Sequence, residues 1–572
     1  MPTVNIDGKS IAFEGKHRLL QFALDNQIEI PYFCYHPAMS TPTNCRMCLV
    51  EVGFHAKNRA TGELQYDENE KPVIQWGRKP ATACNTNLSD GMYVKTHRSS
   101  ETIKKDQQGV LEYMLVNHPL DCPICDQAGE CPLQIWTYKY GPEGSRFENK
   151  KRHKNKRVEL GPNVVLDEER CINCTRCTRF TEEISGSNQL TITGRGDKNC
   201  PSTAPGQVFD DPYSMNTIDI CPVGALTSKQ HRFQARVWEM NSSPSIDMND
   251  STGTNINIWI RDNKVMRITP AENPAVNGYW MPDAHRLNIS RYNDDRISGV
   301  KIIGGMPINF QEGIQKVAQR IKSYEGEIFF LGSAYASLES NFALKELANK
   351  LGVATVYYVS HLVESYGDGW LIQDDRTPNA AACELLGFEK LTLADFDRKF
   401  SNKEIDFLYS LENDRVFREL QAEISQATVI AHANQECAIY DNIDFVLPAA
   451  TAIEGEGTYI NHQGIPQLSR LSKQIYQMTS DMWMRLPKSR LDKGAVAVDK
   501  WRNLENIFDV LPSWMLITQI ATEMGEDMSY KHHKDIFAKL QEEFDILRDI
   551  KVSYKPPKGA FKSTQLEYAP KW

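Results

Sequence analysis

The chain is predicted to be a multidomain protein, α+β in its first part and α/β in its second. Three observations predict this. At 572 residues it is too long for a single hydrophobic core. Of its 14 cysteines, 12 lie within the first 221 residues, most of them in C-x-x-C groups. From about residue 295 to 510, apolar strands alternate with helical stretches, which is the pattern of a parallel sheet covered by helices.

Composition and charge exclude several classes of protein. Hydrophobic residues at 41% and charged residues at 24% are ordinary for a globular protein. No run of apolar residues is long enough to predict a transmembrane helix. The first residues lack the basic start and apolar run of a signal peptide. The formal net charge of −9 argues against general nucleic-acid binding, and the clustered cysteines favour metal binding in a reducing compartment.

Residues 1–97 contain the first group of candidate metal ligands. Their spacing is C-x10-C-x2-C-x35-C. Four thiolates that converge from a loop and a strand suit a 2Fe–2S cluster, and a structural zinc site is the alternative. The residues are Cys34, Cys45, Cys48 and Cys84.

The secondary structure expected around these cysteines resembles that of β-grasp ferredoxins. Apolar patterns predict a helix over residues 18–26 between short strands. The strands are expected at Val4–Ile6, Ser10–Phe13, Met47–Val52 and Met92–His97. The polar stretch from Phe54 to Pro80 is expected to be an inserted hairpin or loop.

A second ligand set combines one histidine with three cysteines in the segment Asn117–Cys131. A lone histidine is more often a core or surface residue, but prolines and a glycine here shape the backbone so that side chains can converge. Three cysteines leave one position of a 4Fe–4S cluster unfilled, and the histidine supplies it. The set is His118, Cys122, Cys125 and Cys131.

A third set begins with C-x2-C-x2-C and closes with a cysteine in a Cys-Pro-Val-Gly-Ala-Leu-Thr segment. Because no second C-x-x-C group follows, these four residues are expected to hold one 4Fe–4S cluster. Cys200 also precedes a proline and is the rival for the fourth position, but its surroundings lack the pattern, and we interpret it as structural. The set is Cys171, Cys174, Cys177 and Cys221.

A basic run extends from Arg146 to Arg157. It is interpreted first as a solvated loop, second as a source of positive charge near anionic clusters, and last as an RNA-binding segment. The remaining cysteines, Cys383 and Cys437, lie in apolar surroundings and are expected to be core residues.

In their order, the three ligand sets resemble those of the large iron–sulfur subunits of NADH–quinone oxidoreductase, respiratory complex I. Residues 240–290 resemble the cluster-binding segment that opens molybdopterin oxidoreductases, but Asp247, Asp250, Thr254 and Pro282 stand at the ligand positions. The segment Asp444–Gly464 resembles a further molybdopterin-oxidoreductase signature. The resemblance implies a retained scaffold without that cofactor.

The resemblance suggests six domains. These are a 2Fe–2S ferredoxin-like domain (1–97), a one-histidine/three-cysteine 4Fe–4S segment (98–140), a 4Fe–4S domain (141–235), a degenerate cluster-binding segment (236–292), a molybdopterin-oxidoreductase-like α/β domain without cofactor (293–510) and a C-terminal docking extension (511–572).

The function that the resemblance implies is electron relay from an NADH- and flavin-binding partner subunit toward a quinone-side iron–sulfur subunit. One 2Fe–2S and two 4Fe–4S clusters are expected, with no molybdopterin, flavin or NAD on this chain. Because it has neither a G-x-G-x-x-G after a strand nor a P-loop, the nicotinamide and flavin sites are assigned to a partner. The expected place is the peripheral arm of complex I at the cytoplasmic side of a bacterial inner membrane, with membrane association through partners alone and no catalytic residue of its own. The alternatives are a diaphorase subunit of a soluble hydrogenase or formate dehydrogenase, and an active molybdenum enzyme.

Overall fold

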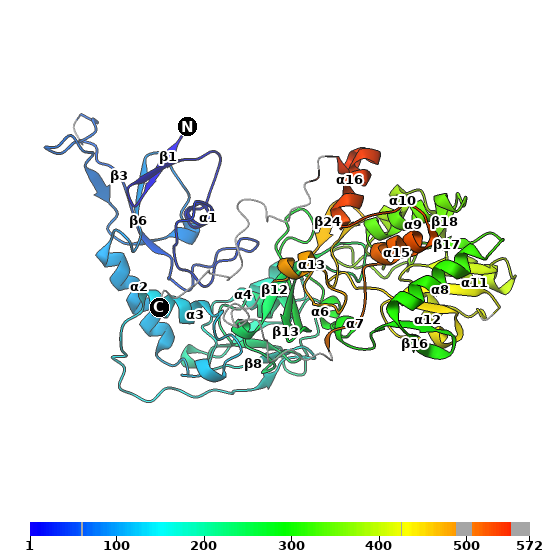
Figure 1. The fold of residues 1–572 in the computed structure, drawn as a ribbon. Coiled ribbons are helices and arrows are strands. Elements are labelled where there is room, and N and C mark those ends of the chain that lie inside the picture. Colours follow the sequence, from blue (N-terminus) through cyan, green and yellow to red (C-terminus); the bar gives the residue numbers. More distant parts are fainter. Residues whose placement is uncertain (59–60, 425, 488–505, 549, 551–572) are drawn as a thin grey trace. The chain divides into compact units, whose positions relative to one another are not determined.

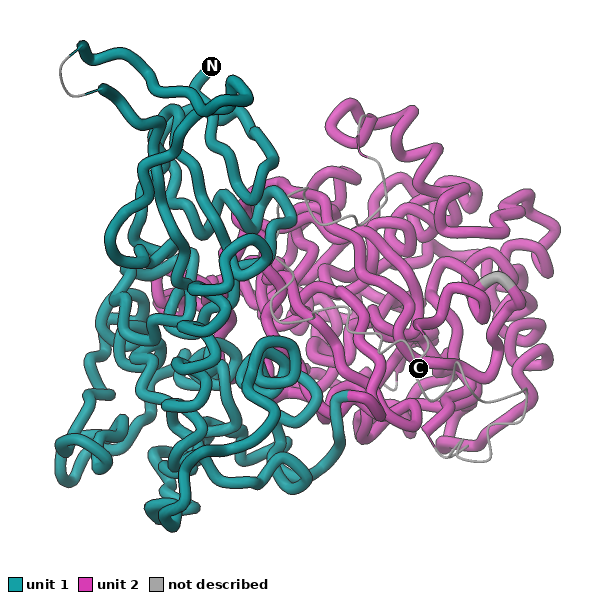
Figure 2. The backbone as a smooth tube through the Cα atoms, turned by 90° about the vertical axis from the view of Figure 1, so that its left-hand side faces the viewer, with its two compact units in different colours: residues 1–237, 557–572 teal, residues 238–556 magenta. Residues whose placement is uncertain are grey.

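A computed structural model describes residues 1–58, 61–424, 426–487, 506–548 and 550 (Figure 1). The chain divides into two compact units, coloured separately in Figure 2. Among the described residues, unit 1 is Met1–Val237 and unit 2 begins at Trp238. The six finer domain limits remain predictions. No described helix combines the length and the apolar character needed to cross a membrane.

Unit 1 begins with a mixed sheet of six strands in the order β2-β1-β6-β3-β4, with β5 paired to β3. Strands β1 and β6 are parallel, and the other pairs are antiparallel. Helix α1 buries Leu20 and Ala23 in the same core as Val4 and Ile6, so the predicted β-grasp arrangement is confirmed. The bounds are β1 Thr3–Ile6, β2 Lys9–Ala12, α1 Leu19–Asp25, β3 Leu49–His55, β4 Ile74–Trp76, β5 Ala81–Thr82 and β6 Met92–Lys95.

The predicted insertion at residues 54–80 extends this sheet. Strands β3 and β4 pair in antiparallel register from Gly53 opposite Trp76 to His55 opposite Ile74. An isolated bridge between Lys57 and Leu64 lies beyond their ends. The insertion is therefore a hairpin, which is one of the two structures predicted for it.

The remainder of unit 1 consists of short elements that hold the second and third ligand sets. Helix α2 starts at an N-cap, Ser100, whose Oγ accepts a hydrogen bond of 3.2 Å from the backbone N–H of Ile103. Two small antiparallel sheets follow, in the orders β11-β8-β7 and β10-β9. The bounds are α2 Glu101–Leu115, α3 Pro132–Tyr140, β7 Val158–Glu159, β8 Val164–Leu166, α4 Arg176–Arg179, β9 Thr191–Thr193, β10 Cys200–Ser202, α5 Asn216–Asp219 and β11 Leu226–Ser228.

Unit 2 opens with an antiparallel sheet, β12-β13-β14, and two short helices. Alternate residues of β13, Ile256, Ile258 and Ile260, are buried in one core with Met281 and Ile453. The bounds are β12 Asn241–Ile246, β13 Asn255–Arg261, β14 Lys264–Pro270, α6 Asp283–Leu287 and α7 Ser290–Asn293.

An eight-stranded sheet in the order β16-β15-β22-β21-β20-β17-β18-β19 dominates unit 2. The six strands from β22 to β19 are parallel, whereas β15 is antiparallel to both of its neighbours. The strand bounds are β15 Val300–Ile302, β16 Met306–Ile308, β17 Phe329–Leu331, β18 Val356–Val359, β19 Glu389–Leu391, β20 Phe407–Ser410, β21 Thr428–Ala433 and β22 Phe445–Pro448. The predicted parallel α/β pattern is confirmed, and its chain order is that of doubly wound sheets, with the switch point between β17 and β20.

Helices and one further hairpin complete unit 2. The helices are α8 Phe310–Lys322, α9 Leu338–Lys350, α10 Ala380–Leu385, α11 Leu393–Ser401, α12 Asp414–Glu419, α13 Ser480–Arg485, α15 Ser513–Met524 and α16 His533–Glu543, and the hairpin is β23 Gly457–Ile460 with β24 Pro466–Ser469. Helix α15 packs on α8 and α9. Of the predicted docking extension (511–572), residues 549 and 551–572 lie outside the described residues.

Candidate iron–sulfur centres

The first ligand set gathers at one end of the β-grasp sheet. Cys34 lies in the loop after α1, Cys45 and Cys48 immediately precede β3, and Cys84 follows β5. All four are buried. Arg46 adopts the left-handed backbone region, with φ of 57°, and so turns the chain sharply between two of the cysteines.

The side chains of this set meet in two pairs. The Cys34 and Cys45 thiols are hydrogen-bond partners, and so are Cys48 and Cys84. The Cys45 partner lowers the pKa of Cys34 to about 6. The structure therefore brings all four predicted residues to one place, with a thiolate already favoured at one of them.

The second set lies between helices α2 and α3. His118 follows α2, Cys122 and Cys125 bound a 3-10 turn, and Cys131 is the N-cap of α3. Cys125 and Cys131 are buried while Cys122 is exposed. Each of these cysteines lies close enough to influence the charge of another.

His118 has the properties of a neutral ligand. Burial, with Arg170 and Lys151 nearby, lowers its pKa to about 4, so the imidazole is uncharged at neutral pH. Its Nδ1 atom is buried without a hydrogen-bond partner. Arg170 also lies beside Cys125, which places the histidine and the cysteines around a common cation. A free imidazole nitrogen together with three thiols fits a 4Fe–4S cluster.

The third set surrounds a small hollow. Cys171, Cys174, Cys177 and Cys221 all line it, together with apolar residues such as Ile192 and Val223. Burial raises the pKa of Cys174 to about 12. A soft, thiol-lined and otherwise apolar hollow fits an iron–sulfur cluster.

Cys200, the rival for the fourth position, also lies near this set. Its side chain contacts that of Cys171 and helps to raise the pKa of the latter. It is absent from the lining of the hollow, whereas its neighbour Pro201 is part of it. The assignment of Cys221 as the ligand remains a prediction, and the geometry gives it the better position.

The segments that carry the third set contact both of the others. A Cβ atom added to Gly224, in the loop after Cys221, would lie 2.1 Å from the Sγ of Cys125, so only glycine allows this approach. The Sγ of Cys131 lies 3.7 Å from the carbonyl oxygen of Pro222 in the same loop. The loop that carries one candidate ligand therefore packs directly on two candidate ligands of the second set.

Two buried arginines make the corresponding link to the first set. Arg179 donates to the carbonyl oxygen of Cys34 at 2.5 Å, and Arg176 donates to that of Tyr35 at 2.5 Å. Arg176 also donates to the carbonyl oxygen of Ile220 at 2.9 Å. Sequence reasoning missed both arginines, because nothing in the segment Cys174–Arg179 indicates which distant backbone they bind.

Cations of the predicted basic run surround the second set. Lys156 lies 2.6 Å from Asp121, and Lys151 donates to the carbonyl oxygen of Leu115 at 2.6 Å. Both lysines act on the charge of His118. Of the three interpretations, the structure favours positive charge placed near a candidate cluster.

In unit 2 the switch point of the parallel sheet is occupied by protein. The N-terminus of α9, where an anionic ligand would bind, holds the carboxylate of Glu339. Thr458 of β23 donates to that carboxylate through its backbone N–H at 2.8 Å and its hydroxyl at 2.7 Å. Next to β17, a Cβ atom on Gly332 would lie 2.4 Å from the Phe388 ring.

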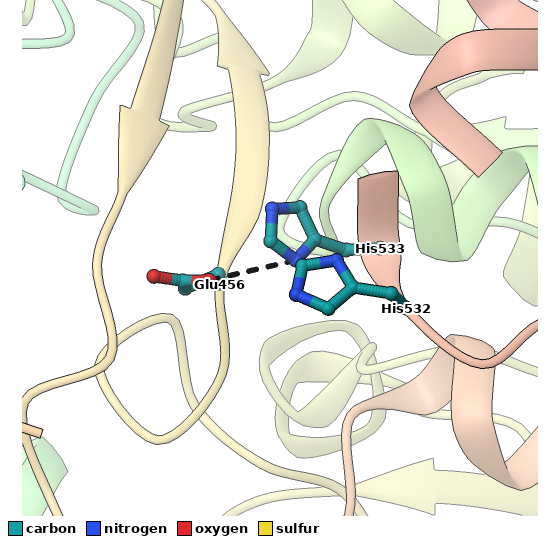
Figure 3. A group of neighbouring side chains, drawn as sticks. All are labelled: Glu456, His532 and His533. Atoms are coloured by element: carbon teal, nitrogen blue, oxygen red, sulfur yellow. Dashed lines mark ion pairs between the residues drawn. The ribbon is translucent and has the colours of Figure 1, made fainter. Parts of the chain in front are cut away.

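Among the described residues of unit 2, two groups of histidine and carboxylate side chains lie close together. Figure 3 shows one of them, in which Nδ1 of His533 lies 3.5 Å from a carboxylate oxygen of Glu456 and His532 lies alongside. The Arg485 guanidinium also binds the carboxylate of Glu456. The carboxylate already has a cation as its partner, which disfavours a metal ion there. The other group is Asp247, Asp250 and His285.

The fold and these sites define a protein built from ferredoxin-like and 4Fe–4S-binding domains. Four segments match known families: residues 1–99 the 2Fe-2S iron-sulfur cluster binding domain, 107–146 the NADH-ubiquinone oxidoreductase-G iron-sulfur binding region, 161–227 the NADH-quinone oxidoreductase subunit 3, ferredoxin-like domain, and 240–290 the NADH-ubiquinone oxidoreductase NDSU1/NuoG-like, 4Fe-4S domain.

The predicted resemblance to the large iron–sulfur subunits of NADH–quinone oxidoreductase is confirmed by the relatives that the chain matches. Relatives include the NADH-ubiquinone oxidoreductase 75 kDa subunit of Reclinomonas americana, 38% identical over 63% of this chain and 49% of that protein. Another is the mitochondrial NADH-ubiquinone oxidoreductase 78 kDa subunit of Neurospora crassa, 37% identical over 61% of this chain and 45% of that protein. The chain thus spans about half the length of the curated relatives that it matches.

A solved structure of an NAD+-reducing [NiFe]-hydrogenase in the H2-reduced state also matches, at 28% identity and a TM-score of 0.33. The match covers 41% of this chain and 91% of that one.

Proposed function

We propose that the chain is an iron–sulfur electron-relay subunit of an NADH–quinone oxidoreductase. The contact between the third ligand set and both others carries the proposal, because it makes three separate candidate centres one continuous region of unit 1. The similarity to NADH–quinone oxidoreductase subunits supports the assignment. When bound, the clusters would supply one-electron carriers.

The residues that would hold these clusters are the three predicted sets. Cys34, Cys45, Cys48 and Cys84 would bind 2Fe–2S; His118, Cys122, Cys125 and Cys131 would bind one 4Fe–4S; and Cys171, Cys174, Cys177 and Cys221 would bind the other. Because the third set contacts both others, we place it in the middle of the relay. Arg176 and Arg179 supply positive charge beside it.

The exposed side of the second set is our candidate for electron exchange with a partner. Cys122 is the exposed member of this set. Leu120 is 87% exposed and Ile124 60% exposed on either side of it. Large apolar side chains around an exposed ligand suit a protein interface. The partners we propose are a flavin- and NADH-binding subunit and a quinone-side iron–sulfur subunit, with membrane association only through the assembled complex.

We also propose that unit 2 is a scaffold without molybdopterin or nucleotide. The carboxylate of Glu339 at the N-terminus of α9 supports this, because it would repel a phosphate group there. The hydrogen bonds from Thr458, within the segment that resembles a molybdopterin signature, fix the carboxylate in that place.

Metal content and NADH oxidation test this function. A fully loaded chain should contain about 10 iron atoms and no molybdenum. Alone it should not oxidise NADH, since it has no dinucleotide fingerprint, but NADH should reduce it once a flavin-bearing partner is added. NADH oxidation by the isolated chain, free of flavoprotein, would refute the relay, and stoichiometric molybdenum would refute the scaffold.

A further inference from the structure

Two carboxylates and an imidazole form a buried group in the segment that matches a 4Fe–4S domain yet contains no cysteine. Asp247 and Asp250 lie in the loop between β12 and β13, and His285 lies on α6. Their side chains are at most 5% exposed. One ligand atom from each lies within 4.8 Å of the other two. Sequence reasoning found the two aspartates but missed the histidine.

The distances within the group are those of ligands around one small ion. The Nδ1 of His285 lies 2.6 Å from Oδ2 of Asp247, and its Nε2 lies 3.9 Å from Oδ2 of Asp250. Zinc bonds to histidine nitrogen and carboxylate oxygen of about 2.0–2.2 Å place tetrahedral ligands about 3.4 Å apart. The observed separations lie on either side of this value, so small side-chain rotations would adapt the group to an ion.

The polar atoms of the group are unevenly satisfied. Oδ1 of Asp247 accepts from the side chain of Asn249 at 2.5 Å, and Oδ1 of Asp250 accepts from the backbone N–H of Thr252 at 2.9 Å. Oδ2 of Asp250 also accepts from the backbone N–H of Gln373 at 3.0 Å, and Oδ2 of Asp247 and Nδ1 of His285 face each other at 2.6 Å. Thr254, fully buried on the same loop, has an unpartnered Oγ1. A buried polar atom without a partner points to a missing ligand.

The charge of the group also permits a cation. Burial opposes a proton on His285, but Asp247 and Asp250 raise its pKa, so without metal the two carboxylates and the imidazolium carry −1. A divalent cation that displaces this proton would neutralise the two carboxylates. Arg291 and Arg376 lie close to this group, but each has another partner. Arg291 donates to the carbonyl oxygen of Met248 at 3.0 Å, and Arg376 lies 4.4 Å from the centre of the Tyr366 ring.

We propose that Asp247, Asp250 and His285 bind one divalent first-row transition ion, for which Zn²⁺ is the probe. Imidazole and carboxylate together suit such ions, whereas iron–sulfur clusters prefer thiolates. The ion would fasten the β12–β13 loop to α6. This role is structural and does not depend on the relay function proposed for unit 1.

The test uses the full chain with its clusters. The protein is dialysed against Zn²⁺, freed of excess metal, and analysed for zinc, manganese and iron. Wild type should hold about one zinc per chain, and Asp250→Asn or His285→Gln should lower this at least about tenfold with iron unchanged. Glu456→Gln, in the group of Figure 3, is the matched control and should keep the zinc.

A second measurement does not depend on whether the Asp250 and His285 variants fold. Zn²⁺ should raise the Tm of wild type and of Glu456→Gln, because an ion that binds only the folded state stabilises it. The proposal fails if wild type retains neither zinc nor manganese and its Tm does not respond. It also fails if the Asp250 and His285 variants bind as much zinc as wild type, since the zinc would then lie elsewhere.

Discussion

The cores of the two units are built from different side chains. In unit 1 one core contains buried cysteines of all three ligand sets: Cys34, Cys45, Cys131, Cys174 and Cys177. Its strands β7 to β11 have at most three residues each. Unit 2 instead packs helices against a long parallel sheet, with a core of aliphatic and aromatic side chains. Unit 2 can hold itself together by apolar burial, whereas the interior of unit 1 is built around thiols.

The protonation state of those thiols indicates how the two units differ in their source of stability. Burial raises the pKa of Cys131 and of Cys174 to about 12, so without metal these groups stay protonated. Thiolate is the form that binds iron, and metal binding releases the proton. Unit 1 should therefore gain much of its stability from cluster binding, and unit 2 should gain none from it.

Iron removal should give the largest effect of all. Chelation should abolish hydrogen-exchange protection over residues 161–227, because metal-binding free energy there is folding free energy. Peptides that cover β17 to β22 should keep their protection, since their hydrogen bonds belong to the sheet. Equal loss of protection in both units would show that unit 2 also depends on the clusters. Equal retention of protection would show that unit 1 folds without them.

Removing one thiol tests which cysteine completes the third set. Cys221→Ser should lower the iron content by about four atoms per chain, since a hydroxyl replaces thiolate poorly. Cys200→Ser is the matched control, because Cys200 contacts Cys171 but does not line the hollow. It should leave the iron content unchanged. The reverse result would make Cys200 the ligand.

These centres show what a sequence can and cannot predict. The ligand groups followed from local spacing, because C-x-x-C places thiols together whatever surrounds them. The helix and strands around the first set, and the alternation of strands and helices in unit 2, followed from apolar periodicity. The packing of Gly224 on Cys125, and the meeting of Asp247 with His285, depend on tertiary contacts between segments far apart in the chain. No local pattern encodes those contacts, so the order of the sets in space and the buried group in unit 2 had to come from the structure.

A buried ion pair tests how much of the stability of unit 2 comes from its own interior contacts. Arg296 binds Glu454 through two hydrogen bonds of 2.7 Å, with neither side chain exposed. Burial alone would raise the pKa of Glu454, but Arg296 and Lys473 lower it to about 2. Arg296→Met should destabilise unit 2 by about 3–5 kcal/mol, because a buried carboxylate loses its main partner.

The control for this substitution is an exposed pair. Lys316 and Glu312 lie one helical turn apart at 2.7 Å, and both are about half exposed. Lys316→Met should change stability by less than about 1 kcal/mol. Calorimetry can follow the transition of unit 2 in both variants. Equal effects would mean that Arg296 contributes no more than a surface charge.

Glu412 gives unit 2 a pH dependence of its own. Burial raises its pKa to about 8, so the folded state keeps a proton that the unfolded state has lost above about 4.5. Stability from this group is present below the unfolded pKa and falls as the pH rises toward 8. Between pH 6 and 7.5 the loss should be roughly 2 kcal/mol. Glu412→Gln should remove this slope in the Tm of unit 2, and exposed Glu542→Gln should not.

The smallest expected effect concerns the histidine of the second set. His118→Cys replaces a neutral imidazole by a thiolate, which adds one negative charge to a 4Fe–4S site and should lower its potential. A shift of about 59 mV corresponds to a tenfold change in a one-electron equilibrium. Lys151 and Lys156, which already influence His118, should limit the shift. Redox titration of wild type and variant measures it, with His153→Cys as the control because His153 lies in the basic run outside the ligand sets. An unchanged potential at every centre of the His118 variant would mean that the imidazole, although buried with a free nitrogen, does not bind the cluster.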